Sequence, residues 1–440
     1  LSNMMVPLAG LFDAAFLGPL ANINYLAGVI LGGILFDYLY RILKFLRNST
    51  NTLTANAAGQ DDPTAVLVAL LRCGVIALVI AGVMLLLQYP IHKLGFAVLS
   101  GSSEIEIAGL DYFNARIWGA PAVLLNFVLI GWFLGREMNG VVFLMSLIGN
   151  GTNVLFDYLM ILKWGWESAG AGIATALSQY LALLVGLGAI AVSIHRSSQW
   201  PLLKPAWVQV MDRQALTSAI ALKGNILVRF LALISAYAIF TNLSAAFGTK
   251  SLAENGLLLQ IALLSQFTVQ GVGMTSQTLI GNFKGKGRKD QILPVLRVAL
   301  VSGLAIALAF ALATLLLPST VFGLLTNHSE VSEAMQQYTG WLVPLLSLTA
   351  AAFMLESYFT GIKDGATLRN GALIGFAVGF MPLVALAIYQ QSESLLWAAL
   401  TAYMGVLLIF LTYKLVKTHQ RLLLADEETA SVSEEAPVAS

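Results

Sequence analysis

Long apolar runs separated by short polar segments recur along the whole 440-residue chain. The runs are continuously apolar and do not alternate between polar and apolar positions, which favours membrane-spanning helices over the strands of a barrel. A helix needs about 20 residues to cross the hydrocarbon core of a bilayer. We therefore predict twelve spanning helices, at residues 1–18, 24–46, 65–88, 112–135, 139–163, 168–194, 217–247, 252–278, 292–317, 333–359, 370–390 and 395–418.

The first apolar run, at residues 1–18, is short for a full span. We expect that part of the first helix precedes Leu1 or that the start of the chain is unusual. The run lacks the pattern of a cleaved signal peptide, because no basic segment comes before it and no cleavage site is evident.

The composition is that of a membrane protein. Only 11% of the residues are charged and 58% are hydrophobic, whereas soluble domains carry about 25% charged residues. Cys73 is the only cysteine, which excludes a disulfide scaffold and predicts a buried, inert thiol. The net charge of +1 gives no sign of a polyanionic partner, so we predict no binding of nucleic acid. The predicted fold class is an all-α, polytopic membrane protein.

Lysine and arginine are concentrated in the connections that follow even-numbered helices. They are Arg47, Arg136, Arg196, Lys204, Arg213, Lys284, Lys286, Arg288, Lys289, Lys363, Arg369, Lys414, Lys417 and Arg421. Only Lys93, Lys163 and Lys250 follow odd-numbered helices. Because cytoplasmic loops carry the excess of basic residues, we predict that both termini and the even-numbered connections face the cytoplasm.

The longest polar connection, residues 195–216, divides the chain into two sets of six helices. We predict an N-terminal lobe at residues 1–194, with a truncated first helix, and a C-terminal lobe at residues 217–418. The connection between them is a predicted cytoplasmic linker. The acidic end of the chain, residues 419–440, has the composition of a disordered cytoplasmic tail.

An internal repeat supports this division. Residues from Tyr25 onward match residues from Ser251 onward at a constant offset of 226. The identical pairs are Leu26/Leu252, Ala27/Ala253, Thr52/Thr278, Leu53/Leu279, Asn56/Asn282 and Gly59/Gly285. Six helices in each half give both halves the same orientation. We therefore predict two lobes related by a pseudo-twofold axis along the membrane normal, with a cavity between or within them.

Carboxylates inside the predicted spans are the strongest candidates for function, because a central Asp costs roughly 2.5–3.5 kcal/mol on insertion scales. Asp13 lies in the first helix, six residues after Pro7, which can kink that helix. We predict that Asp13 carries protons. The alternative is a hydrated carboxylate near the extracellular end of the helix.

Asp157 lies in the predicted helix 139–163 together with Asn150 and Asn153. Their i, i+3, i+7 spacing places the three side chains on one face. A polar stripe of this kind must face protein or water rather than lipid. We predict a functional site here, with a structural network of interhelical hydrogen bonds as the alternative.

Two other predicted spans contribute polar candidates. Thr175 and Gln179 lie one turn apart at residues 168–194, although a threonine in a spanning helix usually bonds its own backbone. Glu356 lies in the helix at 333–359, within two turns of Lys363. It is either a second titratable site or a carboxylate shielded near the cytoplasmic end.

Enzymatic motifs are absent from the sequence. The four histidines fall in predicted loops or at helix ends, and none of the patterns HExxH, GxSxG or GxxxxGK[ST] occurs. We therefore predict no catalytic residue, no cofactor and no resident metal. An ion gradient is the remaining source of energy.

Five segments resemble the MATE (multidrug and toxic compound extrusion) family, most closely its DinF-like branch. They are FDAAFLG at Asp13, NVLFDYLMIL at Asp157, SAGAGIATALSQ at Thr175, RNSTNTLTANAAGQDD after the second helix and TSQTLIGNFKGKGRKD after the eighth. The similarity runs from the first residue to about Lys417. It implies an antiporter that exports amphipathic, often cationic compounds while protons or sodium ions enter.

The resemblance also implies a titratable cluster in the N-terminal lobe. Asp13 would be its helix-1 carboxylate, Asn153 and Asp157 its helix-5 amide and acid, and Thr175 its helix-6 hydroxyl. The chain departs from the family at two places. The seventh helix has no acidic residue, which argues against a sodium site in the C-terminal lobe, and Ala instead of Thr follows Asp13. Glu356 stands where this branch usually has Asp.

We predict a monomeric, proton-coupled exporter that works by alternating access among membrane lipids, with sodium as the alternative coupling ion. The candidate substrate contacts are Phe12, Phe16, Asn126, Phe156 and Gln179. A bacterial inner membrane is the expected location, and a plastid membrane is the alternative. A flippase for lipids or lipid-linked saccharides is the alternative function, but intramembrane Arg and Lys are too scarce for the basic cavity it needs.

Overall fold

The structure is a computed structural model that describes residues 23–99, 103–210, 213–323 and 335–434. These residues form helices and short connections, and no strand occurs among them. Ten of their helical stretches are long and apolar enough to cross a membrane. The predicted first helix, at residues 1–18, lies outside the described part of the chain. The all-α membrane fold class is confirmed.

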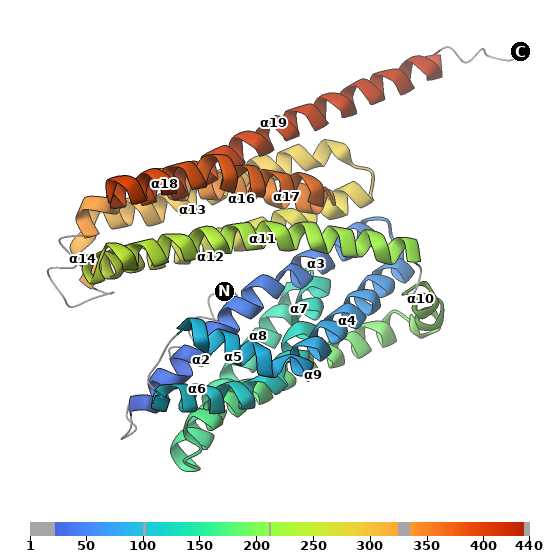
Figure 1. Ribbon diagram of the computed structural model, residues 1–440. Helices are drawn as coiled ribbons and strands as arrows, with labels where there is room; N and C mark the ends of the chain where they lie inside the picture. Colours follow the sequence, from blue (N-terminus) through green and yellow to red (C-terminus); the bar gives the residue numbers. More distant parts are fainter. Residues whose placement is uncertain (1–22, 100–102, 211–212, 324–334, 435–440) are drawn as a thin grey trace, which may run out of the picture. The chain divides into compact units, whose positions relative to one another are not determined.

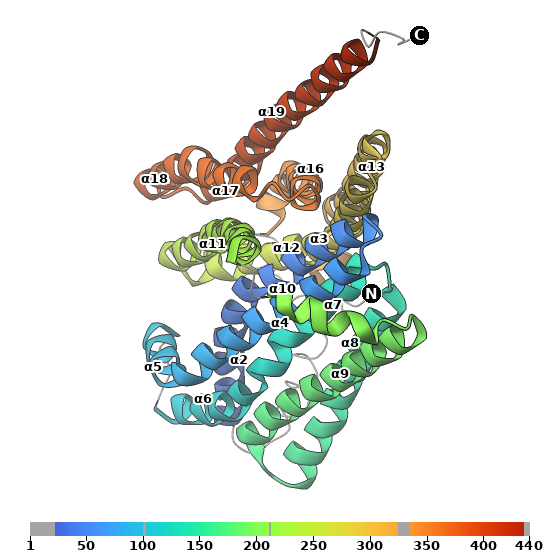
Figure 2. The ribbon, with the colours of Figure 1, turned by 90° about the vertical axis from the view of Figure 1, so that its right-hand side faces the viewer.

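The helices follow one another with short connections (Figures 1 and 2). The elements up to residue 210 are α2 (Ile23–Leu43), α3 (Phe45–Gly59), α4 (Pro63–Leu86), α5 (Gln88–Leu99), α6 (Ser103–Arg116), η1 (Ile117–Gly119), α7 (Ala120–Gly135), α8 (Asn139–Asp157), η2 (Tyr158–Lys163), α9 (Glu167–Arg196), η3 (Trp200–Leu202) and α10 (Leu203–Val210). The later elements are α11 (Arg213–Phe247), α12 (Thr249–Gly285), η4 (Lys289–Gln291), α13 (Ile292–Leu316), α14 (Pro318–Gly323), η5 (Thr339–Trp341), α16 (Leu342–Gly361), α17 (Gly365–Ile374), η6 (Gly375–Phe380), α18 (Met381–Gln390) and α19 (Glu393–Glu434).

The helix α3 is the main difference from the predicted elements. The predicted second span ends at residue 46, but α3 continues as far as Gly59. Its polar side chains are buried, among them Asn51 and Asn56. A run of Asn, Thr and Ser has the composition of a connection. The hydroxyls of Ser49 and Thr50 bond the carbonyl oxygen of Leu46 in the same helix, whereas the amides of Asn51 and Asn56 find partners on other helices.

The predicted eighth span also ends too early, because α12 continues beyond residue 278 to Gly285. Two further helices, α6 and α19, extend well beyond the predicted spans. The helix α6 begins at Ser103 instead of residue 112. The helix α19 continues to Glu434, through most of the tail at 419–440 that the sequence predicts to be disordered. Both extensions contain Glu, Ala and aliphatic residues, which sustain a helix after the apolar run has ended.

The internal repeat is visible in the backbone as well. Left-handed conformations occur in pairs at the offset of 226, with φ between 51° and 72°. The pairs are Asp61 and Gly287, Glu137 and Lys363, and Gly165 and Gln391. Corresponding connections in the two halves therefore turn in the same way.

Contacts between residues divide the chain into two compact units. Unit 1 contains Leu1–Phe230, Met274–Val295 and Thr360–Lys363. Unit 2 contains Leu231–Gly273, Leu296–Phe359 and Asp364–Ser440. The C-terminal ends of α12 and α16 thus belong to the same unit as α3 and α7. The lobe boundaries at residues 194 and 217 remain a prediction.

Small residues allow the helices of unit 1 to approach closely. A Cβ atom at Gly135 of α7 would lie only 2.7 Å from Cβ of Thr54 in α3. A Cβ atom at Gly28 of α2 would lie 2.6 Å from Cβ of Ala108 in α6. Close approach through small residues is typical of helix packing in membranes, where apolar burial alone gives little driving force.

The predicted linker at residues 195–216 is partly helical, and its helix α10 packs on α4. Arg72 of α4 donates hydrogen bonds to the carbonyl oxygens of Gln209 (2.7 Å) and Val210 (3.3 Å). Leu67 and Ala206 lie in one buried apolar cluster beside them. Polar and apolar contacts therefore hold the linker against unit 1.

In unit 2, the elements α17, η6 and α18 pack along α19 (Figure 2). A Cβ atom at Gly379 of η6 would lie 2.6 Å from the carbonyl oxygen of Ala402. A buried amide makes a further link to α19, because Oδ1 of Asn255 accepts a hydrogen bond from the indole of Trp397 (2.8 Å) and its Nδ2 donates to Glu393 (3.0 Å).

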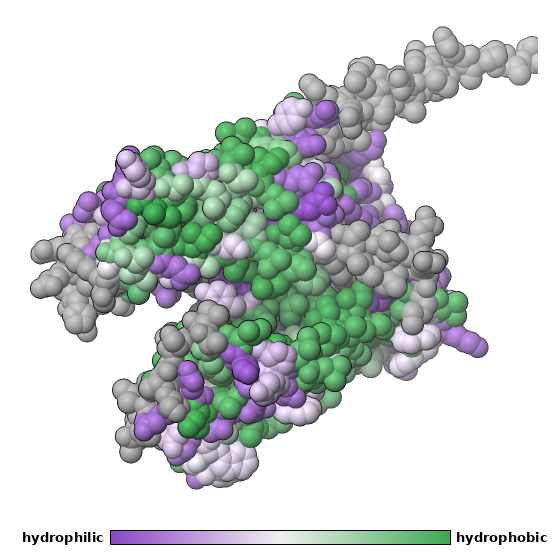
Figure 3. Space-filling view, in the orientation of Figure 1, coloured by the Kyte–Doolittle hydropathy of each residue, from purple (hydrophilic) through white to green (hydrophobic). Residues whose placement is uncertain are grey.

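Apolar side chains cover much of the visible molecular surface (Figure 3). On α4, Leu78, Val79 and Val83 are each about half exposed. An exposed apolar helix face of this length is stable when lipid covers it. The chain is therefore a multi-pass integral membrane protein.

Candidate functional site

The helix α8 carries the polar stripe that the sequence predicts. Its buried positions recur every three or four residues and are Val142, Met145, Gly149, Asn153 and Asp157. The side chain of Asp157 has no exposed surface, and Asn153 is 4% exposed. Asn150 is only half-buried, and its amide donates to the carbonyl oxygen of Ser146 in the same helix (2.7 Å). The buried face thus presents one carboxylate and one amide.

The amide of Asn153 has an unusual environment. Among the described residues no hydrogen-bond partner is found for its Nδ2 atom, although the atom is buried. A buried donor without a partner costs about 1–3 kcal/mol. A buried donor of this kind requires an acceptor from outside the described residues.

The winding of the helix changes directly after Asp157. Residues Tyr158–Lys163 form the π-helical segment η2. The N–H group of Trp164 donates to the carbonyl oxygen of Leu159 (2.9 Å), five residues earlier. Segments of π-helix are rare and are frequent at functional sites. The buried carboxylate therefore lies where the geometry of the spanning helix is interrupted.

The helices α8 and α9 form an antiparallel pair in unit 1 (Figure 1). A Cβ atom at Gly170 of α9 would lie 3.2 Å from the backbone of Met160. With a rise of about 1.5 Å per residue, this register brings Asp157 and Thr175 to within about one helical turn of the same depth. The predicted carboxylate and hydroxyl are thus on neighbouring helices at one level.

The hydroxyl of Thr175 bonds its own helix. It donates to the carbonyl oxygen of Ala171 (3.0 Å). Thr401, at the offset of 226, makes the equivalent bond to Trp397 (2.8 Å). Both halves therefore contain this bond, which stabilises a hydroxyl inside a spanning helix.

Asp157 and Asn153, by contrast, have no polar counterpart in the second half. The residues at the offset of 226 are Leu383 and Gly379. Because both halves share the same helical framework, the framework itself does not require an acid or an amide at these positions. The pair is a specific feature of the N-terminal half.

Asn126 and Gln179, two candidates for substrate binding, contact one another. The Asn126 amide donates to the backbone oxygen of Gln179 (2.9 Å) and to its Oε1 atom (3.2 Å). Asn126 is 4% exposed, and within the described chain its own Oδ1 atom has no partner. This pair links α7 to α9 and leaves one buried acceptor available.

The remaining candidates are divided between the undescribed segment and the two units. Asp13, Phe12 and Phe16 lie outside the described residues. Phe156 is half-buried on α8. Glu356 is buried on α16 and belongs to unit 2. Across the described ranges, no group of three or more His, Cys, Asp and Glu side chains is arranged to hold a metal ion.

Arg116 is a charged residue in unit 1 that the sequence-based candidates do not include. It lies near the middle of the spanning stretch Glu104–Gly135. Its guanidinium carbon is 4.7 Å from the ring centre of Phe36 and 5.4 Å from that of Tyr112, whose hydroxyl accepts a hydrogen bond from it. Contacts of this kind stabilise a cation away from water. The backbone of α6 packs here on Gly172, which brings Arg116 to the depth of the candidate site.

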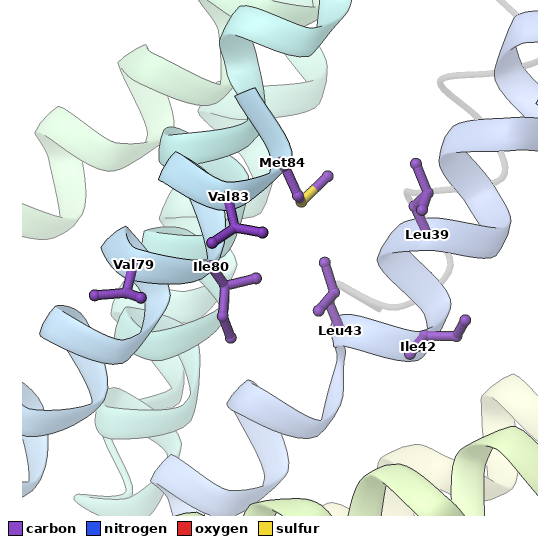
Figure 4. Close-up of a pocket in the computed structure, with 7 residues that line it drawn as sticks. All are labelled: Leu39, Ile42, Leu43, Val79, Ile80, Val83 and Met84. Carbon is purple, nitrogen blue, oxygen red and sulfur yellow. The ribbon is translucent and has the colours of Figure 1, made fainter. Parts of the chain in front are cut away.

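An apolar groove of about 270 Å³ lies between α2 and α4 (Figure 4). It is lined by Leu39, Ile42, Leu43, Val79, Ile80, Val83 and Met84. None of the candidate coupling residues is among them. A groove lined by aliphatic side chains suits a hydrocarbon chain and not an ion.

The sequence model of the MatE family matches residues 1–159 and 226–386, which is most of the chain. The chain therefore belongs to the MatE family, whose members are transporters for the efflux of drugs and toxic compounds. The resemblance seen in the sequence motifs is confirmed. The chain is 29% identical to DNA damage-inducible protein F of Escherichia coli (strain K12), over 92% of the chain and 87% of that protein.

Two further relatives are a plant and a bacterial protein. Protein DETOXIFICATION 44, chloroplastic, of Arabidopsis thaliana is 24% identical over 92% of the chain and 77% of its own length. The probable multidrug resistance protein NorM of Thermotoga maritima is 22% identical over 87% of the chain and 79% of its own length.

Solved structures share the fold. A multidrug resistance MATE transporter in an outward-facing conformation superposes with a TM-score of 0.83 at 17% identity, covering 94% of the chain and 93% of that structure. A transporter of the MOP superfamily from Pyrococcus furiosus superposes with a TM-score of 0.80 at 17% identity, with the same coverage. The predicted MATE-like fold is therefore confirmed.

Proposed function

We propose that the chain exports amphipathic, cationic organic compounds across a bacterial plasma membrane in exchange for protons, by alternating access. The observation that supports this most strongly is Asp157, a carboxylate without exposed surface one turn after the buried amide of Asn153. A charged carboxylate in a spanning helix is unfavourable, and binding a proton removes its charge. Proton binding at Asp157 would therefore change the packing of unit 1 around α8.

Asp13 is the proposed second carboxylate of this site, from its place in the predicted first helix. Two neighbouring carboxylates take up and release protons as a coupled pair. Loss of charge would allow the first helix to rearrange around Pro7 and to close the pocket, which favours release of the substrate outward. Asn126 and Gln179 are the proposed polar substrate contacts, and Phe156 is a proposed apolar contact.

The proton gradient supplies enough energy for this exchange. Each proton that enters through a membrane potential of 100 mV contributes about 2.3 kcal/mol. At about 1.4 kcal/mol for each tenfold ratio, this sustains a roughly fiftyfold gradient of one exported molecule. Relatives that carry the name of multidrug resistance proteins support small organic substrates of varied structure.

The test is the variant Asp157→Asn, which keeps the size of the side chain and cannot exchange a proton. Purified protein in liposomes would be assayed for movement of a lipophilic cationic dye and for lumenal pH at the same time. We expect at least a tenfold loss of proton-driven export, since each 1.4 kcal/mol of lost coupling is tenfold. Asp111→Asn, which changes an exposed carboxylate of α6, is the matched control and should export normally.

Correctly inserted Asp157→Asn protein that exports dye at the wild-type rate would contradict this role. A second arm identifies the coupling ion by imposing a sodium gradient without a pH gradient. Export driven by sodium alone would show that sodium replaces the proton.

A further inference from the structure

The two repeat segments that follow the second and eighth predicted spans contact one another inside unit 1. The contact joins α3 to the end of α12 from Met274 to Gly285. Asn51 donates a hydrogen bond to the Thr278 hydroxyl (2.8 Å). Gln277 donates one to the Thr52 hydroxyl (3.0 Å). Residues 51 and 277, and 52 and 278, are pairs at the offset of 226, so each half gives one amide to one threonine of the other.

About two helical turns later, a glycine of each half packs against the backbone of the other half in the same reciprocal way. A Cβ atom at Gly59 would overlap the carbonyl oxygen of Asn282, and one at Gly285 would overlap the carbonyl oxygen of Asn56. The Cβ at Gly285 would also lie 2.9 Å from Cα of Gly59. These neighbours are backbone atoms, which cannot rotate away as a side chain can. The contact therefore forms only while both positions are glycine.

The asparagines of this contact also bind the adjacent connections. The amide of Asn282 donates to the Glu137 carboxylate after α7 (2.8 Å). The amide of Asn56 donates to the carbonyl oxygen of Gly361 after α16 (3.3 Å). The connections that follow the predicted second, fourth, eighth and tenth spans thus meet at one place. Their basic residues place this contact at the cytoplasmic end of the helices.

The buried surface of α3 has an unusual composition for a permanent contact. Asn51, Thr52 and Asn56 are all buried in this contact. A hydrogen bond between polar groups contributes only about 0.5–1.5 kcal/mol net, because water replaces it when the groups separate. A polar surface is therefore stable both when it is packed and when it is hydrated, whereas an apolar surface strongly favours the packed state.

We propose that this contact, which we call the repeat junction, is the gate at the cytoplasmic end of the transport path, closed in this structure. The proposal rests on the proposed alternating access. Opening the junction would break the paired hydrogen bonds and expose α3 to water. Closing it would require the glycine backbones at residues 59 and 285 to meet again.

The first test uses Gly59→Ala and Gly285→Ala, which obstruct closure. Spin labels at the exposed positions Gln60 and Arg288, in a Cys73→Ala background, report the separation across the junction. We expect a shift to longer distances and about a tenfold loss of export, the effect of destabilising one of two states by about 1.4 kcal/mol. Gly82→Ala is the matched control, because a Cβ atom there has open space around it.

Unchanged distances and unchanged export in both alanine variants would overturn the proposal. A second test remains decisive if these variants fold poorly. Asn51→Cys combined with Thr278→Cys would be joined by a short, reducible bis-thiol reagent, with each single-cysteine variant as the control. We expect export to stop on cross-linking and to return on reduction, whereas undiminished export would show that the contact is permanent.

The spin-label distances require neither substrate nor an ion gradient, so the two proposals fail separately. A shift to longer distances in Gly59→Ala, together with sodium-driven export, would support the gate and overturn proton coupling. Loss of proton-driven export in Asp157→Asn, together with undiminished export after cross-linking of the junction, would support proton coupling and overturn the gate.

Discussion

Individual polar atoms distinguish the buried face of α8 from its half-buried side. Asn150 satisfies its amide within its own helix, whereas no partner for the amide of Asn153 occurs among the described residues. Both residues have the same side chain and lie three positions apart. This difference in hydrogen bonding supports the proposal that Asn153, rather than Asn150, belongs to the coupling site.

Asn153→Leu should stabilise the protein and impair its function. Leucine has a similar volume and removes a buried donor, so we expect the free energy of unfolding to rise by about 1–3 kcal/mol. Proton-driven export should fall at the same time. Thermal unfolding in detergent and export from liposomes would measure the two effects.

Asn150→Leu is the control for this substitution, because it removes an amide that is already bonded and half-buried, and it should raise stability less. A lower stability of Asn153→Leu than of the wild type would show that the amide of Asn153 has a partner in the folded protein.

At the scale of elements, the helices α3 and α10 depart from what hydropathy indicates. Both lie in segments whose composition is typical of connections, and both are packed in unit 1. Hydropathy detects a helix that faces lipid, because that helix must be apolar. It does not detect a helix whose polar groups find partners on neighbouring helices, since those partners are distant in sequence.

Arg72→Met tests how α10 is held. The substitution keeps an extended side chain but removes the hydrogen bonds to Gln209 and Val210, which should lower stability by about 1–3 kcal/mol because the donor is charged. We expect faster proteolysis between residues 195 and 216, detected by mass spectrometry of the fragments.

The matched control is Arg297→Met, which replaces an exposed arginine of α13. Wild-type proteolysis of the Arg72 variant would indicate that the apolar contacts of Leu67 and Ala206 are sufficient to hold α10.

At the scale of the whole molecule, the repeat and the basic residues together predict its orientation. Corresponding connections turn in the same way in both halves, as the left-handed residues Glu137 and Lys363 show. Most basic residues of the connections follow even-numbered helices. Both halves cross the membrane in the same direction, and in both halves the basic residues follow even-numbered helices. Because basic connections face the cytoplasm, we expect the repeat junction to lie on the cytoplasmic side.

Single cysteines in a Cys73→Ala background test this orientation. In intact cells, a membrane-impermeant maleimide should label Tyr389→Cys, at the exposed end of α18, but not Gln60→Cys or Arg288→Cys. All three should react after the cells are opened. Labelling of Arg288→Cys in intact cells would reverse the predicted topology.

The part of the candidate site that lies on α8 could be predicted from the sequence, because it depends only on the spacing of residues within one helix. The spacing of Asn153 and Asp157 places them on one face, and the structure buries both. Arg116 was visible in the sequence as a single cation within a spanning stretch, but the aromatic rings that stabilise it come partly from α2. Asp13 lies outside the described residues, so its place beside Asp157 stays a prediction.

By itself the sequence determined that this protein is a bundle of membrane-spanning helices and where most of those helices begin and end. The predicted span 139–163 coincides with α8 and η2. The sequence determines these features because lipid surrounds each spanning helix separately and requires a continuous apolar stretch of sufficient length in each. Only the tertiary structure decided that α3 is buried, that Asn153 differs from Asn150, and that Gly59 meets Asn282. Those outcomes depend on which distant segment supplies the partner, and no local property of the sequence contains that information.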